Sequence, residues 1–344
     1  MMEYEVTIGI PVYNVEKYIR MAIESALGQT FKSIEFLICD DCGTDTSMDI
    51  VRYYQRNHPR GKDMRIVRQP QNMKLGAARN RIIKEARGKY LFHLDADDEI
   101  YPNTIELLYN ALRQYDAQIV YGSSEWIYVE TGGKVESHVY PSMHFLSEDD
   151  FANWAYRTYD GIQANTWNFL IDVDVYRKNG IMHQPINFWE DFTVTMDLPT
   201  YISKAVLLPN ITYKYYLRNG SLSNFQKRKV IAKDEIVKTI DAIRAVKNNS
   251  ERIRSKSYYP KRSYKLMLTC FFMACAILRN EQLIVPSFTN SEIRDMMASP
   301  LSFRQICQFK EWRLKNLCMY LVGVLPADFA VWLIKMIGKK KGIV

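Results

Sequence analysis

The first 125 residues alternate short apolar runs with segments of helical periodicity, and this alternation limits the possible folds more than any other feature of the sequence. The runs VTIGIPV, IEFLIC, RIV, YLFHL and AQIVYG are short and rich in β-branched residues, and several are apolar throughout, which is typical of strands buried on both faces. Between them, residues 16–27, 76–86 and 102–112 place apolar side chains on one helical face. The pattern predicts a three-layer α/β fold with a mostly parallel central sheet flanked by helices.

Polar clusters stand at the predicted strand ends. PVYNVE follows the first strand, DDCGTD follows the second, NMKLGAARN precedes a helix, and DADD follows YLFHL. Open α/β sheets bind their ligands outside the carboxyl ends of the strands. We therefore expect these loops to meet at one edge of the sheet and to form a single site.

The DADD cluster concentrates negative charge, and no basic residue stands beside it in the sequence. This indicates that a cation that is not part of the chain binds there. Asp95 and Asp97 flank one small residue, and Mg²⁺ commonly binds one or two carboxylates together with substrate phosphates. For Asp98 we favour a different role, the capping of the helix that begins just beyond it. Arg79 in GAARN stands at the same predicted edge, where it contacts either a phosphate oxygen or an acidic partner at the surface.

Other common site types lack their signatures. Neither GxxxxGK[ST] nor GxGxxG occurs, which disfavours P-loop nucleotidases and dinucleotide-dependent oxidoreductases. The pair Cys39 and Cys42 is a lone CxxC whose intervening acids disfavour a thiolate, so we expect reduced, intracellular cysteines. His93 has no partner histidine at ligand spacing and is interpreted as a packed strand residue. The acidic N-terminal segment does not resemble a secretory signal.

The motifs together resemble glycosyltransferase family 2. The resemblance rests on the stretch from VTIGIPVYN to DDCGTDTS, then on GAARN and YLFHLDADDEIYP, and it covers residues 5–115 in order and spacing. It continues more thinly into TWNFLIDVDVYRKNGI, NFWEDFTVTMDL and YKYYLRNGSLSN, as in bacterial polysaccharide and capsule-type members. It implies a GT-A fold and transfer of a sugar from a nucleotide sugar with inversion.

The resemblance also implies roles for individual residues. Asp95 and Asp97 match the DxD motif, with Asp97 as ligand of Mg²⁺ or Mn²⁺ and Asp95 toward the metal and the ribose. The matching donor-binding residues are Pro11, Tyr13, Glu16, Asp40, Asp41, Arg79, Asp95, Arg218 and Ser221.

Inverting transfer needs a carboxylate that removes the proton of the acceptor hydroxyl. The segment WEDF supplies Glu190 and Asp191, and the resemblance assigns Asp191 as the base and Glu190 as its orienting neighbour. Repulsion between the two acids raises one pKa toward a useful range. Read without the resemblance, the same pair also suits a helix N-terminus, where acids complement the helix dipole. Phe169 stands where family members often carry lysine.

The charge of the chain is divided unevenly. Residues 1–224 hold 23 Lys and Arg against 29 Asp and Glu, whereas residues 225–344 hold 23 against 9. We expect a catalytic GT-A domain over residues 1–224, with a nucleotide-binding half to residue 125 and an acceptor half from residue 126, followed by a basic helical region over residues 225–344. Within these parts we expect a hairpin turn at TGGK, strands at KAVLLP and ITYKYYLR, and a linker at residues 247–257.

The last 29 residues combine an apolar stretch with the run Lys339 to Lys341. Pro326 and Asp328 interrupt the stretch, which favours two short helices lying on an anionic membrane surface. A packed subdomain and a true span are the alternatives. The Lys and Arg residues are scattered without a recognition module, so we expect no nucleic-acid partner.

These features predict a cytoplasmic glycosyltransferase that is peripheral on the inner face of the cytoplasmic membrane. Its expected donor is a UDP-sugar, and its acceptor is the hydroxyl of a glycan or of a polyprenyl-linked glycan in surface-polysaccharide synthesis. The alternative is a catalytically silent subunit that binds nucleotide sugars and regulates a synthase.

Overall fold

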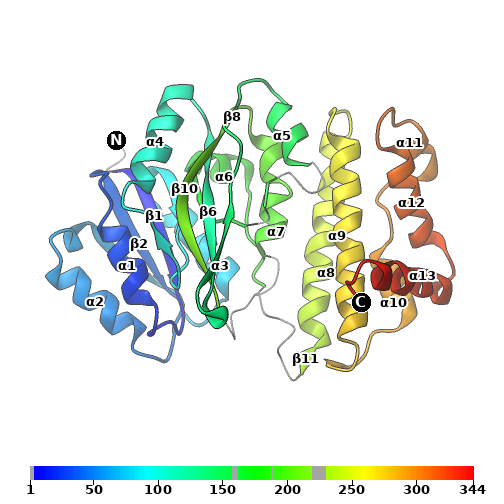
Figure 1. The fold of residues 1–344 in the computed structure, drawn as a ribbon, viewed down its shortest axis with the longest axis horizontal. Coiled ribbons are helices and arrows are strands. Elements are labelled where there is room, and N and C mark those ends of the chain that lie inside the picture. Colours follow the sequence, from blue (N-terminus) through cyan, green and yellow to red (C-terminus); the bar gives the residue numbers. More distant parts are fainter. Residues whose placement is uncertain (1–3, 157–161, 164, 187–189, 219–229) are drawn as a thin grey trace. The chain divides into compact units, whose positions relative to one another are not determined.

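The computed structural model describes residues 4–156, 162–163, 165–186, 190–218 and 230–344. Within this part the chain forms two compact units. The first unit comprises Met1–Phe151 and Ala164–Ser221, and the second comprises Ala152–Gln163 and Leu222–Val344. Figure 1 follows the chain through both.

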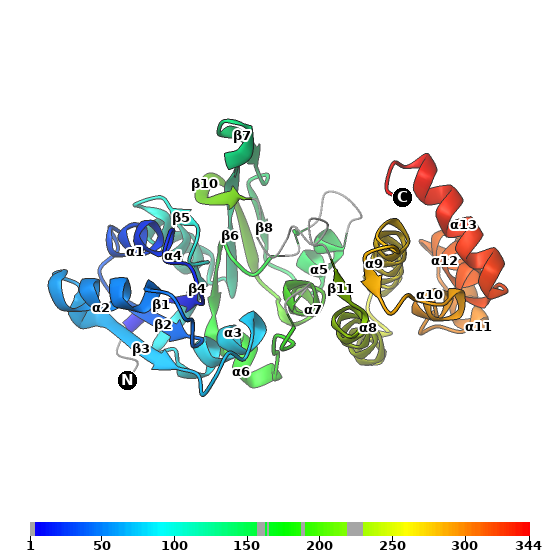
Figure 2. The same cartoon turned by 90° about the horizontal axis from the view of Figure 1, so that it is seen from below.

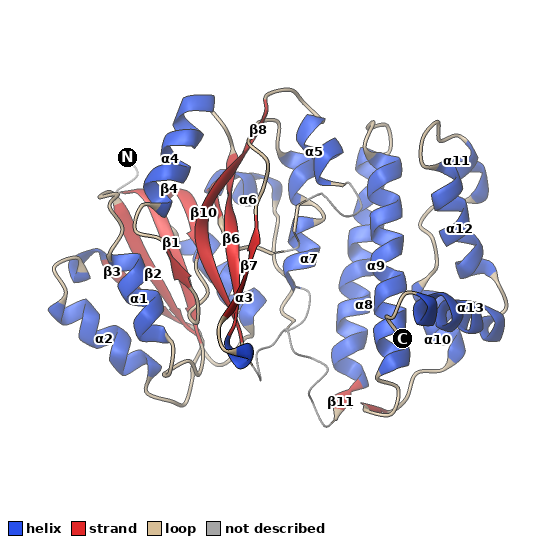
Figure 3. Cartoon of the chain, viewed as in Figure 1, coloured by secondary structure: helices blue, strands red, loops and turns tan. Residues whose placement is uncertain are grey.

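The first unit is an α/β structure built on one sheet (Figure 3). Its strands are β1 (Tyr4–Val12), β2 (Ile34–Asp40), β3 (Met64–Arg68), β4 (Gly88–His93), β5 (Glu99–Ile100), β6 (Ile119–Tyr128), β7 (Lys134–His138), β8 (Met143–Phe145), β9 (Phe169–Asp172) and β10 (Ala205–Leu217). Its helices are α1 (Ile19–Leu27), α2 (Ser47–Asn57), α3 (Leu75–Glu85), α4 (Thr104–Tyr115), α6 (Val173–Asn179) and α7 (Glu190–Thr195), while α5 (Asp150–Ala155) continues into the second unit.

In the described residues the strand order is β3-β2-β1-β4-β9-β6-β10-β5, with β7 beside β6 and β8 beside β10. Strands β3, β2, β1 and β4 are mutually parallel, as the βαβ pattern predicts. Strand β9 then runs antiparallel between β4 and β6 and joins the second half of the unit to the first. The parallel core is thus extended into a mixed sheet.

Helices cover both faces of this sheet, seen from below in Figure 2. Apolar side chains of α1, α2 and α4 form one core with alternate residues of β1 and β2, among them Ile8 and Phe36. Helix α3 covers the opposite face and packs so closely that a Cβ at Gly9 would lie 2.2 Å from Ile82. The two-sided burial explains why these strands are apolar throughout.

Two local predictions for the first unit have different outcomes. The TGGK turn is confirmed, because Gly132 and Gly133 adopt φ values of 72° and 81° between β6 and β7. The runs KAVLLP and ITYKYYLR are strands as predicted, but the structure joins them in the single strand β10. Its pairing with β6 shifts register between Leu207 and Tyr213, which keeps one strand continuous across the polar interruption.

The second unit is helical (Figure 1). Its elements are β11 (Ile231–Ala232), α8 (Lys233–Asn248), α9 (Tyr259–Arg279), β12 (Ile284–Val285), α10 (Asn290–Met296), α11 (Phe303–Cys307), α12 (Arg313–Val324) and α13 (Ala327–Lys340). The linker expected at residues 247–257 is wrong. The segment closes α8 and forms a 3₁₀ turn, Asn249–Ile253, whose Ser250 and Ile253 are buried.

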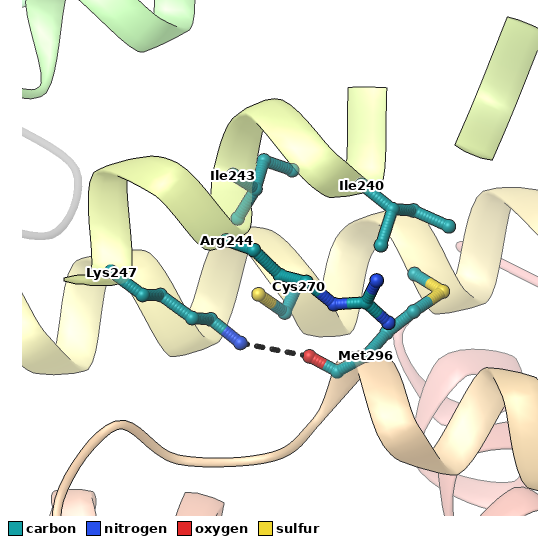
Figure 4. A pocket seen from close by; sticks show the side chains of 6 residues that line it. All are labelled: Ile240, Ile243, Arg244, Lys247, Cys270 and Met296. Carbon is teal, nitrogen blue, oxygen red and sulfur yellow. Dashed lines mark hydrogen bonds between the residues drawn. The ribbon is translucent and has the colours of Figure 1, made fainter. Parts of the chain in front are cut away.

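A small pocket in this unit is lined by side chains of α8, α9 and α10 (Figure 4). The ammonium group of Lys247 donates hydrogen bonds of 2.9 Å to the carbonyl oxygens of Met296 and Ala298. Since the last carbonyls of a helix lack intrahelical donors, this buried lysine stabilises the end of α10.

No helix in the described part of the chain is long and apolar enough to cross a membrane.

Candidate functional site

The DxD segment forms a turn directly after β4, at the carboxyl edge of the parallel strands. Asp98 is buried, and it does not cap the next helix, because the residue at the N-cap of α4 is Asn103. Its carboxylate instead accepts hydrogen bonds of 2.9 Å from the Tyr213 hydroxyl and from the backbone N–H of Tyr216. The capping prediction is therefore wrong, because residues of the C-terminal half of β10 hold this carboxylate in the core.

Tyr213 connects β10 to the DxD turn. Its hydroxyl donates to Asp98 and accepts a 3.2 Å hydrogen bond from the backbone N–H of Asp95. The ring of Trp167 stacks on the Tyr213 ring with a centroid distance of 4.5 Å. These contacts fix the backbone of the turn and so the direction of its acidic side chains. Sequence reasoning missed Tyr213, because nothing local distinguishes it from neighbouring tyrosines.

The GAARN motif brings α3 against a distant segment of the same unit. A Cβ at Gly76 would lie 2.0 Å from the carbonyl oxygen of Gln184, so only glycine permits this approach. The side-chain amide of Asn80 then donates to the His183 carbonyl and accepts from the His183 N–H, both at 2.8 Å. Arg79 lies between these two contacts on the helix, which places it beside the start of α7.

The Arg79 guanidinium joins three carboxylates that are far apart in the sequence. Nη2 donates to Asp95 at 2.9 Å, and Nη1 donates to Glu190 at 2.9 Å and also to Asp191. Arg79 is only 1% exposed, so the alternative of a surface ion pair is wrong. Its position shows that it orients the DxD turn and the Glu190–Asp191 pair relative to each other.

The buried ion cluster changes the acidity of its members. Burial lowers the pKa of Arg79, but the charges of Asp191, Asp95 and Glu190 outweigh this effect and raise the pKa overall. Burial and the charge of Asp191 raise the pKa of Glu190 to about 8. Burial also raises the pKa of Asp191, against the opposing charge of Arg79. Near neutral pH the summed negative charge of Glu190 and Asp191 is therefore smaller than two.

Thr166 is a further member of the cluster. Its hydroxyl donates a 2.6 Å hydrogen bond to Asp191 Oδ1, and hydrogen bonding from Thr166 acts to lower the pKa of that carboxyl. Thr166 therefore favours the ionised form that a base requires. The sequence contains it in NTWNFL, but no spacing rule connects it to WEDF, since 25 residues separate the two.

Asp97 has a different environment from Asp95. Burial and the charge of Asp95 raise the pKa of Asp97 to about 6, while the charge of Arg218 acts in the opposite direction. Arg218 Nη1 lies 3.2 Å from Asp97 Oδ2. The guanidinium carbon of Arg218 lies 4.1 Å from the ring centroid of Tyr18 and 4.7 Å from that of Tyr216. The two rings therefore hold the Arg218 guanidinium beside the acidic turn.

Asp95 and Asp97 are the residues that would hold the divalent cation that the sequence predicts. They offer the carboxylate oxygens that Mg²⁺ and Mn²⁺ prefer. In the residues that the structure describes, no three His, Cys, Asp or Glu side chains are grouped to hold a metal. Mg²⁺ commonly binds one or two carboxylates and takes further ligands from substrate phosphates.

The other predicted donor residues lie at the ends of β1 and β2. Pro11 is in β1, Tyr13 is 45% exposed, and Glu16 accepts hydrogen bonds from the backbone N–H and hydroxyl of Thr46. Asp41 is buried and accepts from the backbone N–H groups at positions 73 and 74, at 2.8 and 3.1 Å.

Asp40 accepts from the backbone N–H of Cys42 at 2.9 Å and lies 3.5 Å from Arg68 Nε. Ser221, the last predicted donor residue, lies outside the described residues. The donor-binding roles themselves stay predictions.

Two predictions that concern other side chains are confirmed. His93 is a packed strand residue, because it is buried and its burial lowers its pKa to about 3, with help from the charge of Arg79. All six cysteines are free. Burial raises the pKa of Cys39 to about 12, which rules out a reactive thiolate there.

Known proteins resemble this chain in sequence and in fold. Residues 7–182 match the family described as Glycosyl transferase family 2. An uncharacterized glycosyltransferase of Escherichia coli K12, YibD, is 29% identical over 229 residues, which cover 65% of this chain and 64% of that protein. A chondroitin synthase of E. coli is 40% identical over 109 residues, or 32% of this chain and 15% of the synthase. The chain thus spans less than two thirds of these relatives.

Solved structures extend the likeness over most of the chain. Residues 1–349 of Staphylococcus aureus TarS with UDP-GlcNAc superimpose with a TM-score of 0.66 at 17% identity, covering 93% of this chain and 90% of that one. A mannosyltransferase of Pyrobaculum calidifontis with GDP-Man and Mn²⁺ gives a TM-score of 0.51 at 12% identity, covering 96% and 87%. These likenesses confirm the predicted α/β GT-A fold with its helical C-terminal region. With half of its residues matched by the family, the chain belongs to glycosyl transferase family 2.

Proposed function

We propose that this protein transfers a sugar from a UDP-sugar, with inversion, to a hydroxyl of a glycan or lipid-linked glycan acceptor during surface-polysaccharide synthesis. Membership of a glycosyltransferase family supports the reaction class. The UDP-GlcNAc complex of the structural neighbour TarS supports a uridine nucleotide. Sequence similarity to a chondroitin synthase supports a polysaccharide product.

The observation that carries the proposal is the position of Arg79. One guanidinium binds the DxD carboxylate Asp95 on one side and the Glu190–Asp191 pair on the other. Direct displacement needs a donor-binding group and a base close together, on either side of the reacting carbon. The fully buried Arg79 keeps these two groups in one rigid cluster.

In the proposed mechanism, Asp191 accepts the proton of the acceptor hydroxyl while that oxygen attacks the anomeric carbon. The bond from the anomeric carbon to the diphosphate breaks, and UDP leaves with the electron pair. The hydrogen bond from Thr166 favours the ionised form of Asp191, and protonation of Glu190, whose pKa is raised to about 8, reduces the negative charge beside Asp191. Base assistance of this kind contributes about 10² to 10⁴ in rate.

Asp97 and Arg218 would act on the leaving group. A bound Mg²⁺ or Mn²⁺, held by Asp95 and Asp97, would neutralise the charge that develops on the diphosphate. Arg218 already stands next to Asp97 between two tyrosine rings, where its guanidinium would meet a diphosphate oxygen. Asp40 and Asp41, with the loop that contains Tyr13 and Glu16, are proposed to bind the uridine.

The test is the release of UDP from a panel of UDP-sugars, with and without Mn²⁺ and acceptor. Asp97→Ala should abolish release and weaken UDP-sugar binding measured by calorimetry. Asp191→Asn should reduce turnover by about 10² or more and leave donor binding intact. Asp49→Asn is the matched control, because this carboxylate lies on α2 with its side chain 76% exposed. Nuclear magnetic resonance of the product would give the configuration at the anomeric carbon.

Retained turnover in Asp191→Asn would refute the base assignment. A product that keeps the anomeric configuration of the donor would refute inversion. Donor binding without release of UDP, across a broad panel of acceptors, would favour the alternative of a regulatory nucleotide-sugar-binding subunit.

A further inference from the structure

The last two helices expose large apolar side chains, independently of the site described above. On α13, Phe329, Trp332 and Met336 are 49%, 54% and 47% exposed. They follow one another at spacings of three and four residues, so they lie on one side of the helix. The rings of Phe329 and Trp332 stack with a centroid distance of 5.3 Å. The outer side of α13 is therefore an apolar stripe with an aromatic end.

The inner side of α13 is already occupied within its own unit. Ala330, Val331, Ile334 and Gly338 are buried, and the side chain of Asp328 accepts a 2.8 Å hydrogen bond from Asn290 at the start of α10. The helix thus buries one face in the core of its unit and, in the described part of the chain, exposes the side chains of Phe329, Trp332 and Met336 on another. Single exposed apolar residues are common, but a row on one helix face indicates a binding surface.

Helix α12 shows the same feature. Leu314 is 75% exposed, and Leu321 and Val324 are 51% and 55% exposed. The sequence RLKNLCMYLVGV of this helix contains two basic residues and no acidic one. Two consecutive helices, joined at Leu325 and Pro326, therefore both present apolar side chains together with positive charge.

The net charge around α12 and α13 indicates which kind of partner binds them. Residues 303–344 hold eight Lys and Arg against two Asp and Glu. Lys339, Lys340 and Lys341 follow the apolar stripe of α13 directly, are exposed, and have no acidic partner in the described part of the chain. An anionic lipid surface satisfies the lysines and the apolar side chains at once.

We propose that α12 and α13 form a membrane-docking surface that binds anionic phospholipid. Phe329, Trp332 and Met336 enter the boundary between headgroups and acyl chains, and the lysine run contacts the phosphates. The surface positions the enzyme at a membrane without a spanning helix. This inference does not depend on the transferase chemistry, since it uses no residue of the catalytic unit.

The proposal is tested by sedimentation of the full chain with vesicles of phosphatidylcholine alone and with about one third phosphatidylglycerol. We expect binding to the anionic vesicles that weakens as salt is raised. The triple variant Lys339→Gln, Lys340→Gln, Lys341→Gln should lose about fivefold in partition coefficient for each lysine, or about 100-fold in all. The double variant Phe329→Ser, Trp332→Ser should lose roughly tenfold or more.

Tyr53→Ser is the matched control, because Tyr53 is an aromatic residue of α2 that is 55% exposed and lies in the catalytic unit. Its partitioning should equal that of the unchanged chain. Circular dichroism and UDP release establish that each variant is folded. A blue shift of Trp332 fluorescence on anionic vesicles, obtained as the difference from Trp332→Phe, would show directly that this ring enters the bilayer.

Equal partitioning of the unchanged chain and of both surface variants would overturn the proposal. So would self-association that Phe329→Ser, Trp332→Ser abolishes in a chain that does not bind vesicles, since the surface would then join two copies. If vesicle binding fails while UDP release is retained, the proposed function stands and only the docking surface is lost.

Discussion

Replacement of Arg79 by methionine tests whether the buried guanidinium holds the site together. The side chain is 1% exposed and binds Asp95, Glu190 and Asp191, so Arg79→Met leaves three acids without their shared cation. Removal of one partner from a buried ion pair costs about 3–5 kcal/mol, because an uncompensated charge stays in the core. That loss is large beside a typical domain stability of about 5–15 kcal/mol.

The pH dependence of this loss has a definite sign. The pKa of Glu190 and that of Asp191 lie above their ordinary values in the folded chain, and Arg79 acts to lower both. An acid with a raised pKa destabilises the folded state when it is ionised, and the cost disappears as falling pH protonates it. The free energy of unfolding lost in Arg79→Met should therefore be largest near pH 8 and should shrink toward pH 5.

The matched control is Arg81→Met on the same helix. Arg81 forms an i,i+4 pair with Glu85 at 3.1 Å, and its side chain is 38% exposed. Exposed pairs of this kind contribute about 0.3–0.5 kcal/mol. Hydrogen exchange of peptides from β4 and β9, measured by mass spectrometry, would assign the loss to the catalytic unit. Equal protection in the two variants, or a loss that grows as the pH falls, would refute the reasoning.

Three further predictions concern residues that position the site. Thr166→Val removes the hydroxyl that favours ionised Asp191, so the acid limb of the kcat/KM profile should move to higher pH; an unchanged limb would contradict this. Tyr213→Phe leaves buried Asp98 with one donor fewer and should lower the free energy of unfolding by about 1–3 kcal/mol in chemical denaturation. Gly76→Ala sets a Cβ 2.0 Å from a carbonyl oxygen and should destabilise the unit by about 1–3 kcal/mol or more, which calorimetry would detect as a lower Tm.

The sequence predicts the parallel half of the sheet well because local patterns determine it. The runs that became β1, β2 and β4 are largely buried on both faces, whereas β3 is a partly buried edge strand, and helices of clear periodicity separate the strands. Strand ends of a parallel sheet share one edge, so the DxD turn and the donor loops could be placed there without coordinates. The sequence did not show that two predicted runs form one strand, β10, because the polar interior of that strand resembles a break. It also gave Asp98 the wrong role, because the partners of Asp98 lie on β10.

Local sequence was enough to predict the fold class and the position of the acidic turn, because both depend on residue types at fixed local spacing. The candidate base Asp191 follows from the family resemblance and stays a prediction. The tertiary structure was needed to show what Arg79 does, since its three partners lie up to 112 residues away. It also distinguishes Thr166 from the other threonines, because it places the Thr166 hydroxyl against Asp191. Long-range contacts form where packing brings segments together, and no local pattern encodes them. Which face of α13 is exposed likewise depends on tertiary packing, because the second unit buries the opposite side of the helix.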